Sequence, residues 1–516
     1  KTEGSERGTG VKEKRTGKKD RKLLWGTIII SMILSLMVFY VLYNANNKYM
    51  TREEKAIHGI LYADGSYDSL PVYYLSREWE YYPDVLLTPG DDLEKYYFRY
   101  FSIGEYGGME LDDRNGNPYG SGTYRLRIML PSEEHTYGLY LPEIFSAYNL
   151  YVDGKLIEQV GNPDPDHYEE RIQHRMFTFK GHTSVEIMIA VTDKDSASPG
   201  IQYVPAFGNP LKVNTVRGIP VFLNSSVFTL VLLVLIFSVW AFFRTRSRAN
   251  ALFAGVCVCV LGYTCYPLLH TYLALRVQPW FSLEMLFYYL TFPAMLLLEH
   301  EITGRKYKWV WWLVGFTAAA GIGATVAGIF AGGMETAALS YGVSAVTEVL
   351  KWFTAICLVV IAFFYTEGTR GLPLLAGTVL YASSLAADRI WPLYDPIIGG
   401  WFPEWGGTIL AGVFGAILWR ELTDGYRMRL IYEEQSRQME LRLMMQKEHY
   451  EKLTGALEEA SRTRHDMRQY IRTASMLLEE EHYEQLREYF HQFAKESSEK
   501  MQAPMCYCKN MSVDAI

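Results

Sequence analysis

The sequence predicts a multi-domain membrane protein with an exported all-β domain, an α-helical transmembrane bundle, and a tail made of a coiled coil and a helical hairpin. Three observations support this fold class. Apolar residues are concentrated in eight long blocks, and about 20 apolar residues suffice to span a bilayer. The segment 44–218 alternates short apolar runs with turn residues, and the chain after residue 421 changes to a seven-residue apolar repeat.

The first apolar block, residues 23–43, has 21 residues and no charge. It follows a polar arm, residues 1–22, with nine Lys or Arg and four Asp or Glu, which we expect to be disordered and cytoplasmic. A cleaved signal peptide is the alternative interpretation. The absence of a clear small-residue cleavage motif after the block favours a retained anchor. In both cases the segment that follows is exported.

Residues 44–218 are expected to form the exported domain. Short aromatic and β-branched runs predict strands, and Asp153-Gly154 between two runs predicts a hairpin turn. Several strands in about 150 residues indicate a β-sandwich or jelly roll. The runs cover residues 72–75, 124–129, 137–141, 148–152, 156–160, 176–179 and 185–191.

Aromatic residues of this domain could stack on a sugar ring, although most of them are expected in the core. The domain carries 26 acidic and 16 basic residues. This balance disfavours a polyanion and favours a neutral or cationic small ligand. The aromatic candidates are Trp79, Tyr81, Tyr82, Tyr96 and Tyr97.

Seven further apolar blocks predict a transmembrane bundle over residues 219–421. Basic residues are concentrated in the loops after the first, third and fifth of these blocks, as in Arg244, Arg246 and Arg248. Because basic loops remain in the cytoplasm, we expect an exported β domain and a cytoplasmic C-terminus. The blocks are 219–243, 249–270, 279–298, 309–331, 339–365, 371–387 and 401–419.

Charged residues inside apolar blocks are costly and are therefore candidates for function. Glu348 and Lys351 are three residues apart, so they share a helix face and can pair. A neutralised pair that fixes helix packing is the favoured interpretation, and a coupling or ligand site is the alternative. Glu284, Asp388 and Arg389 lie near block ends, from which they can reach the interface.

The tail changes to heptad spacing from Tyr432 onward. The repeat predicts a coiled coil over residues 422–462 and a helical hairpin over residues 450–500, with a short break at 479–482. In the second helix Tyr483, Leu486, Phe490 and Phe493 follow a 3–4–3 spacing. Two helices per chain in a homodimer make a four-helix bundle.

His465 is the candidate reactive residue of the tail. It lies one residue after the seam position Arg464, so its imidazole can face solvent. A neutral imidazole is nucleophilic near pH 7 and can attack the γ-phosphate of ATP. Asp466 can hydrogen-bond one ring nitrogen and keep the other unprotonated. A solvated surface histidine is the ordinary alternative.

The composition excludes several other classes of protein. A net charge of −7 without a basic domain argues against a nucleic-acid binder. None of the six cysteines lies between residues 44 and 256, which excludes an exported domain stapled by disulfides. A lone Cys506-x-Cys508 is too small for a zinc site.

Four segments of the exported domain resemble the extracellular sensor domains of bacterial seven-transmembrane receptors. Such domains are similar to galactose-binding-like jelly rolls. The resemblance implies a carbohydrate or other small ligand, although fold does not fix function. The segments are REWEYY at 77–82, LLTP at 86–89, GTYRLR at 122–127 and YNLYVDGK at 148–155.

The tail resembles the dimerisation and histidine-phosphotransfer domain of bacterial sensor histidine kinases, with Arg464-His465-Asp466-Met467-Arg468-Gln469 as its motif. The resemblance implies a membrane-bound homodimer with His465 as phosphoacceptor and a response regulator as partner. It also implies that Gln469 positions water during dephosphorylation. ATP and Mg²⁺ are expected in a kinase domain that this sequence lacks, and residues 501–516 resemble the linker to it.

Two other functions remain open from the sequence. The chain could be a seven-transmembrane receptor that signals through coiled-coil partner contacts without phosphotransfer. It could also be a carrier whose tail only dimerises it, although internal repeats and broken helices, which are typical of transporters, are not evident.

Overall fold

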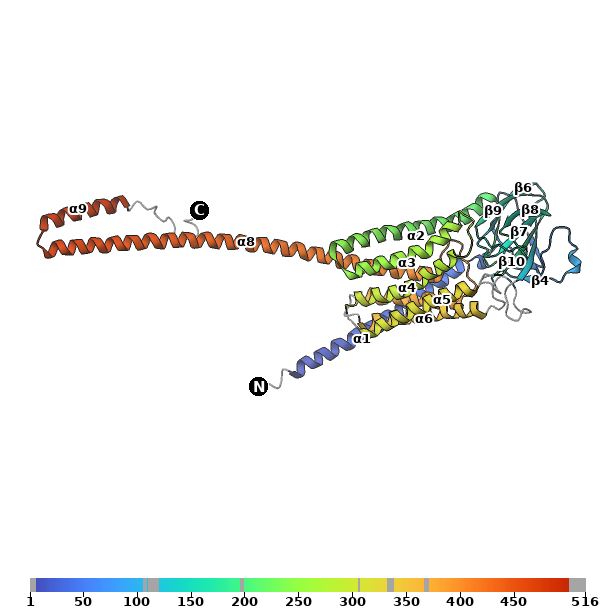
Figure 1. The fold of residues 1–516 in the computed structure, drawn as a ribbon, viewed down its shortest axis with the longest axis horizontal. Coiled ribbons are helices and arrows are strands. Elements are labelled where there is room, and N and C mark those ends of the chain that lie inside the picture. The colour runs from blue at the N-terminus through green and yellow to red at the C-terminus, as the bar shows by residue number, and fades with distance from the viewer. Residues whose placement is uncertain are drawn as a thin grey trace. The chain divides into compact units, whose positions relative to one another are not determined.

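The computed structural model describes residues 6–104, 109, 120–194, 199–304, 307–331, 338–365 and 371–500 (Figure 1). The chain divides into two compact units, Lys1–Arg420 and Glu421–Ile516. The first unit contains all the described strands and a bundle of helices, and the second is helical. The predicted linker 501–516 lies outside the described residues.

Helix α1, Glu6–Ala45, contains the first apolar block and continues into the basic arm. The expectation of a disordered arm is therefore wrong from Glu6 onward. Lys, Arg and Glu are good helix formers, and the adjoining apolar helix removes the cost of nucleation. Inside the first unit α1 packs against α7. Its Phe39 is buried against Tyr394 and Phe402.

The segment predicted to be exported folds into two sheets that share one hydrophobic core. The larger sheet has seven strands in the order β4-β3-β5-β10-β7-β8, with β1 parallel to β5, and the smaller has the order β2-β11-β6-β9. All other pairings in both sheets are antiparallel. The strands are β1 Ile60–Tyr62, β2 Tyr73–Tyr74, β3 Trp79–Pro83, β4 Arg99–Phe101, β5 Gly120–Met129, β6 His135–Leu141, β7 Ala147–Val152, β8 Lys155–Val160, β9 Arg175–Gly181, β10 Ser184–Asp193 and β11 Ala206–Gly208.

The predicted hairpin turn is present between β7 and β8. Asp153 and Gly154 both have positive φ, 46° and 76°. Two consecutive residues in this region make a turn whose twist matches that of the flanking strands. The turn sets the pairing of Val152 with Lys155. Trp79, Tyr81 and Tyr82 are buried, which confirms the core interpretation for these three aromatic residues.

Among the described residues, six helices are long and apolar enough to cross a membrane. Helices that follow one another from α2 to α7 pack against each other, and α4 also packs against α6. The candidate spans are Arg21–Ala45, Pro210–Thr245, Arg248–His270, Trp280–Ile302, Lys308–Phe330 and Tyr341–Phe364. The helices are α2 Pro210–Thr245, α3 Arg248–His270, α4 Trp280–Ile302, α5 Lys308–Ala331, α6 Ala338–Tyr365 and α7 Leu372–Ile390.

The sequence predicted eight membrane spans. The two predicted spans that are not among the six candidates are α7 and the first part of α8. Helix α7 is less apolar because it contains several hydroxyl residues and also Asp388 and Arg389. At least half of its residues are buried against other parts of the protein. A helix surrounded by protein needs less apolar surface than one that faces lipid. Leu375 of α7 and Phe414 of α8 belong to the same core as Phe253 and Leu358.

The second unit consists of the distal part of α8, Phe402–Glu479, and of α9, Tyr483–Lys500. The two helices are separated by residues 480–482, where the sequence predicted a break. Aromatic contacts between α8 and α9 show that α9 folds back along α8 as an antiparallel hairpin. A coiled-coil partner would have to come from another chain.

Candidate functional site

His465 projects from the outer surface of α8. Its side chain is 79% exposed, and that of the neighbouring Asp466 is 53% exposed. The Nδ1 atom of His465 is 3.6 Å from Oδ1 of Asp466. This distance is within ion-pair range but longer than a hydrogen bond. The two predicted residues are therefore adjacent in space as well as in sequence.

The position of Asp466 determines which ring nitrogen is available for chemistry. A carboxylate accepts hydrogen bonds, so it favours the tautomer in which Nδ1 carries the proton. Nε2 then keeps its lone pair and faces away from Asp466. A small rotation of either side chain would close the 3.6 Å separation to a hydrogen bond.

Gln469 is exposed one helical turn after His465. Residues four apart lie on the same face of a helix, so the amide and the imidazole project to the same side. Arg464 and Arg468 flank the histidine and are also exposed. The predicted residues thus form an open, polar surface on one helix rather than an enclosed pocket.

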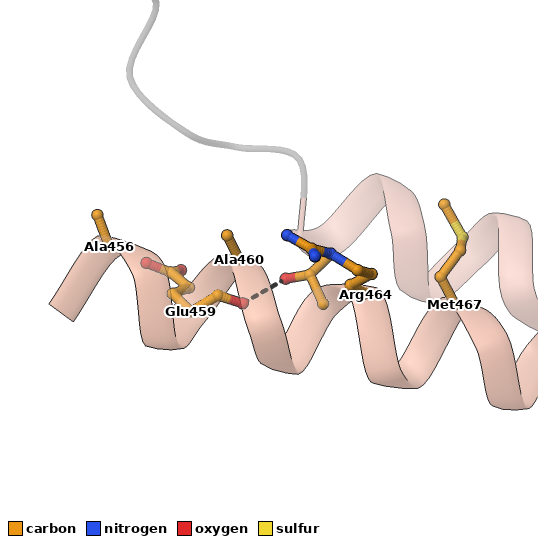
Figure 2. A pocket seen from close by; sticks show the side chains of 6 residues that line it. Ala456, Glu459, Ala460, Arg464 and Met467 are labelled. Carbon is orange, nitrogen blue, oxygen red and sulfur yellow. Dashed lines mark hydrogen bonds between the residues drawn. The ribbon is translucent and has the colours of Figure 1, made fainter. Parts of the chain in front are cut away.

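An open groove adjoins this surface on α8 (Figure 2). The hydroxyl of Thr463 donates to the carbonyl of Glu459 at 2.9 Å, which holds it against the helix. Ala460, Arg464 and Met467 are seam positions of the heptad, so the groove follows the predicted seam. Its described lining is Ala456, Glu459, Ala460, Thr463, Arg464 and Met467.

Charged residues between the seam positions of α8 pair along the helix surface. Arg429 donates to Glu433 at 2.9 Å, and Lys452 lies 2.9 Å from Glu448. The hydrogen bond and the charge of Lys452 lower the pKa of the Glu448 carboxyl. These pairs at i,i+4 support the helix, and their exposure shows that this face is solvated.

The hairpin is closed by an aromatic contact just after the histidine. The ring of Tyr470 lies 4.7 Å from that of Phe493 and 5.8 Å from that of Tyr489. Helix α8 ends in a Schellman motif, in which His482 N–H donates to Leu477 O and Glu481 N–H to Leu478 O. Glu481 takes the left-handed conformation that this motif requires, with φ 60°.

Two apolar faces therefore coexist on the hairpin. The inner face, with Tyr470 and Leu477, packs between α8 and α9 and is partly buried. The predicted seam lies on another face and is exposed in the single chain. We call this exposed set the seam stripe, and it comprises Tyr432, Met439, Leu443, Tyr450, Leu453, Leu457, Met467, Ile471 and Leu478.

The prediction that Glu348 and Lys351 pair is confirmed. Lys351 Nζ donates to Glu348 Oε1 at 2.6 Å. The expectation that Glu284 reaches the interface is wrong, because this residue is only 8% exposed. Helices α3, α5 and α6 all pack against α4. Arg389 is exposed, as expected for a helix end.

Sequence reasoning missed the polar groups where the sheets meet the helix bundle. Lys48, after α1, makes a 2.8 Å ion pair with Asp395, before α8. Glu143, His174 and His270 form a second group. No local motif identifies either group, because each joins residues that are far apart in the chain. The sequence offered one indication of the second group, which is the position of His270 at the end of the apolar block 249–270.

Comparisons with known proteins give no family for this chain. No protein-family model matches it, and no curated protein matches it. Similar solved structures include a GH2 β-galacturonidase from Eisenbergiella tayi, with 12% identity over 27% of this chain and 24% of the enzyme, at a TM-score of 0.20. A β-glucuronidase from Faecalibacterium prausnitzii has 13% identity over 25% and 22%, at a TM-score of 0.17.

A β-glucuronidase from Ruminococcus gnavus aligns with 10% identity over 32% of this chain and 30% of the enzyme, at a TM-score of 0.20. This chain thus spans less than a third of the length of each of these enzymes. A likeness of this size carries no argument about fold or activity.

Proposed function

We propose that this chain is the input and phosphoacceptor part of a membrane sensor histidine kinase, in which His465 receives a phosphoryl group and passes it to a response regulator. The observation that carries the proposal is the exposed His465–Asp466 pair on a helical hairpin with a seam stripe. An acceptor that must meet two partner domains in turn needs this degree of exposure.

The chemistry follows from the tautomer that Asp466 favours. Nε2 of His465 attacks the γ-phosphorus of ATP, a bond forms between nitrogen and phosphorus, and the bond to the bridging oxygen breaks as ADP leaves. The Nδ1 proton stays on the ring, and Asp466 stabilises the positive charge that develops there. In this proposal ATP and Mg²⁺ are supplied by a histidine-kinase catalytic domain.

The proposed homodimer is supported by the seam stripe. Ile471 is 62% exposed and Leu457 is 69% exposed in the single chain. Apolar residues repeated at heptad spacing are buried when a second helix packs against them. A second copy of the chain supplies that helix, and the two hairpins together form a four-helix bundle.

The proposed topology places the jelly-roll sensor domain outside a bacterial membrane and the hairpin in the cytoplasm. It is supported by the basic residues at the start of α1 and by Arg244, Arg246 and Arg248 at the connection of α2 to α3. The buried contacts of Phe39 favour a retained anchor over a cleaved signal peptide.

The proposed ligand of the sensor domain is a small molecule, with a carbohydrate as the first candidate. Tyr97 is 70% exposed and Tyr100 is 44% exposed, and Tyr96 and Phe98 adjoin them. Exposed aromatic rings in one short segment are suited to stacking on a sugar face. Glycan binding that is lost in Tyr97→Ala would support this ligand class.

The test is transfer of radiolabelled phosphate to the full chain in detergent micelles, with ATP, Mg²⁺ and a histidine-kinase catalytic domain added. We expect an acid-labile label that His465→Gln abolishes. His449→Gln is the matched control, because His449 is also exposed on α8, and it should keep the label. Label that survives in His465→Gln would refute the assignment and favour a receptor that signals through partner contacts alone.

A further inference from the structure

A second polar cluster lies where the smaller sheet meets the end of helix α3. Glu143 follows strand β6, His174 precedes strand β9, and His270 is the last residue of α3. All three belong to the first unit. The junction is well connected, because Ile172 and Leu275 exchange backbone hydrogen bonds of 3.0 and 3.3 Å there.

The three side chains converge on one carboxylate oxygen. Nε2 of His174 is 3.1 Å from Oε1 of Glu143, and Nε2 of His270 is 3.7 Å from the same atom. One ligand atom from each residue lies within 4.8 Å of the other two. The two imidazole rings are stacked, with centroids 5.2 Å apart and planes inclined by 13°.

The remaining nitrogens of the two histidines differ in their partners. Nδ1 of His174 is 2.9 Å from the hydroxyl of Tyr140, which fixes the ring orientation. Nδ1 of His270 is buried and has no partner among the described residues, and its side chain is only 2% exposed. The Nε2 atoms of both rings therefore remain as the two nitrogens that lie beside Glu143.

We propose that Glu143, His174 and His270 bind a divalent transition-metal ion of the zinc class. Two imidazoles and one carboxylate are a ligand set for borderline metals such as Zn²⁺, whereas Ca²⁺ and Mg²⁺ prefer oxygen ligands alone. Ligand atoms about 2.1 Å from zinc in a tetrahedral site are a little over 3 Å apart. Side-chain movements of about 1 Å bring the three atoms to that spacing.

The surroundings of the cluster fit a metal site with an open position. The hydroxyl of Tyr140 hydrogen-bonds to Nδ1 of His174 and so orients the ring. Histidines that bind metals commonly make such a hydrogen bond with the nitrogen that does not bind the ion. The side chains of Glu143 and His174 are 22% and 14% exposed, so an ion and one further ligand can enter from solvent. A bound ion would join the sheet directly to helix α3. The site is independent of the proposed phosphotransfer.

The test is metal binding by the full chain in detergent micelles, purified without a polyhistidine tag and stripped with a chelator. Titration with Zn²⁺ should show one tight site per chain. His174→Ala and Glu143→Gln should weaken it at least tenfold, and Tyr140→Phe about 10- to 100-fold. His167→Ala is the matched control, because this exposed histidine pairs with Asp164 in the same domain, and it should leave the affinity unchanged.

Cobalt spectroscopy on the unmodified chain covers the case in which a variant fails to fold. Co²⁺ in a four-coordinate site with nitrogen ligands has an intense visible absorption, and one equivalent should produce it. Zinc affinity that is equal in the unmodified chain and His174→Ala overturns the proposal. So does the absence of the cobalt band, or a loss of affinity in His167→Ala as large as that in His174→Ala.

Discussion

The β domain and the α8–α9 hairpin use the same kinds of residue with opposite burial. Trp79, Tyr81 and Tyr124 of the β domain are fully buried, whereas Tyr450 and Ile471 of the hairpin are 69% and 62% exposed. Two sheets can enclose a core between them, but a two-helix hairpin has a second face with nothing to cover it. The β domain encloses its core within one chain, whereas the hairpin leaves apolar side chains exposed, which is what the proposed dimer would cover.

Ion pairs of the two regions also differ in burial, as one example from each region shows. Arg125 in the β domain lies between Glu80, at 2.7 Å, and Glu186. Burial opposes the positive charge, but hydrogen bonds to Glu186 and Glu80 raise the pKa of the guanidinium above its ordinary value. The pair Arg429–Glu433 on α8 is 71% and 59% exposed, and such surface pairs contribute at most about 1 kcal/mol.

The largest effect is expected from Trp79→Ala in the β domain. Its indole is fully buried, contacts Tyr124 edge-on, and donates a 2.8 Å hydrogen bond to Leu75 O. The substitution should lower the local free energy of unfolding by about 5 kcal/mol. Hydrogen exchange of the β5 and β10 amides measures this, with Tyr97→Ala as an exposed control that should change it by less than about 0.5 kcal/mol.

Lys48→Met should lower the free energy of unfolding by about 3 kcal/mol, because it removes one partner of the buried Lys48–Asp395 pair. The side chains of the pair are 9% and 7% exposed, and Asp395 also accepts a hydrogen bond from the Val204 amide. Faster hydrogen exchange at Val204 would report the loss. The double variant Lys48→Met/Asp395→Asn should recover part of it, and no recovery would contradict a charge-based explanation.

Local patterns predicted those parts of the fold that local chemistry determines. The Asp153-Gly154 turn followed from residues that tolerate positive φ. The Glu348–Lys351 pair followed from helical spacing alone. In each case the residues that determine the structure lie within a few positions of one another.

The parts that could not be predicted depend on contacts between distant segments. Strands β7 to β11 and helix α2 lie in the chain between Glu143 and α3, which ends at His270, and only the tertiary fold brings the two residues together. Spacing does not encode such contacts. The burial of Glu284 was missed for the same reason, because its neighbours come from adjacent helices. The strand order β5-β10-β7 likewise depends on long-range pairing.

An intermediate effect, on association rather than on folding, is expected from Ile471→Glu. The side chain is exposed in the single chain, so helix content should change little. Burial of an isoleucine contributes about 1.5–3 kcal/mol, and dimerisation should weaken accordingly. Sedimentation of the full chain in micelles measures this.

The adjacent residue provides the matched control for the seam stripe. Tyr470 contacts Phe493 within the chain, so Tyr470→Ala should loosen the hairpin and increase exchange of the α9 amides. If Ile471→Glu loosened the hairpin as much as Tyr470→Ala does, the division into an inner face and a seam stripe would be wrong. Unchanged association in Ile471→Glu would contradict the dimer.

The smallest effect is expected from Glu481→Gly at the end of α8. Glu481 has φ 60° in the Schellman motif, and a residue with a Cβ is strained in this conformation by about 1 kcal/mol. Glycine removes the strain but gains freedom in the unfolded chain, so a net stabilisation below about 1 kcal/mol should appear as slower exchange of the α9 amides. Glu480→Gly, one residue earlier, lies just after α8, where φ is not positive and the N–H still donates to Met476 O at 3.1 Å, so it should destabilise the hairpin instead. Equal effects of the two substitutions would mean that backbone strain at the turn does not limit the hairpin, and that the partner surface supplies most of its stability.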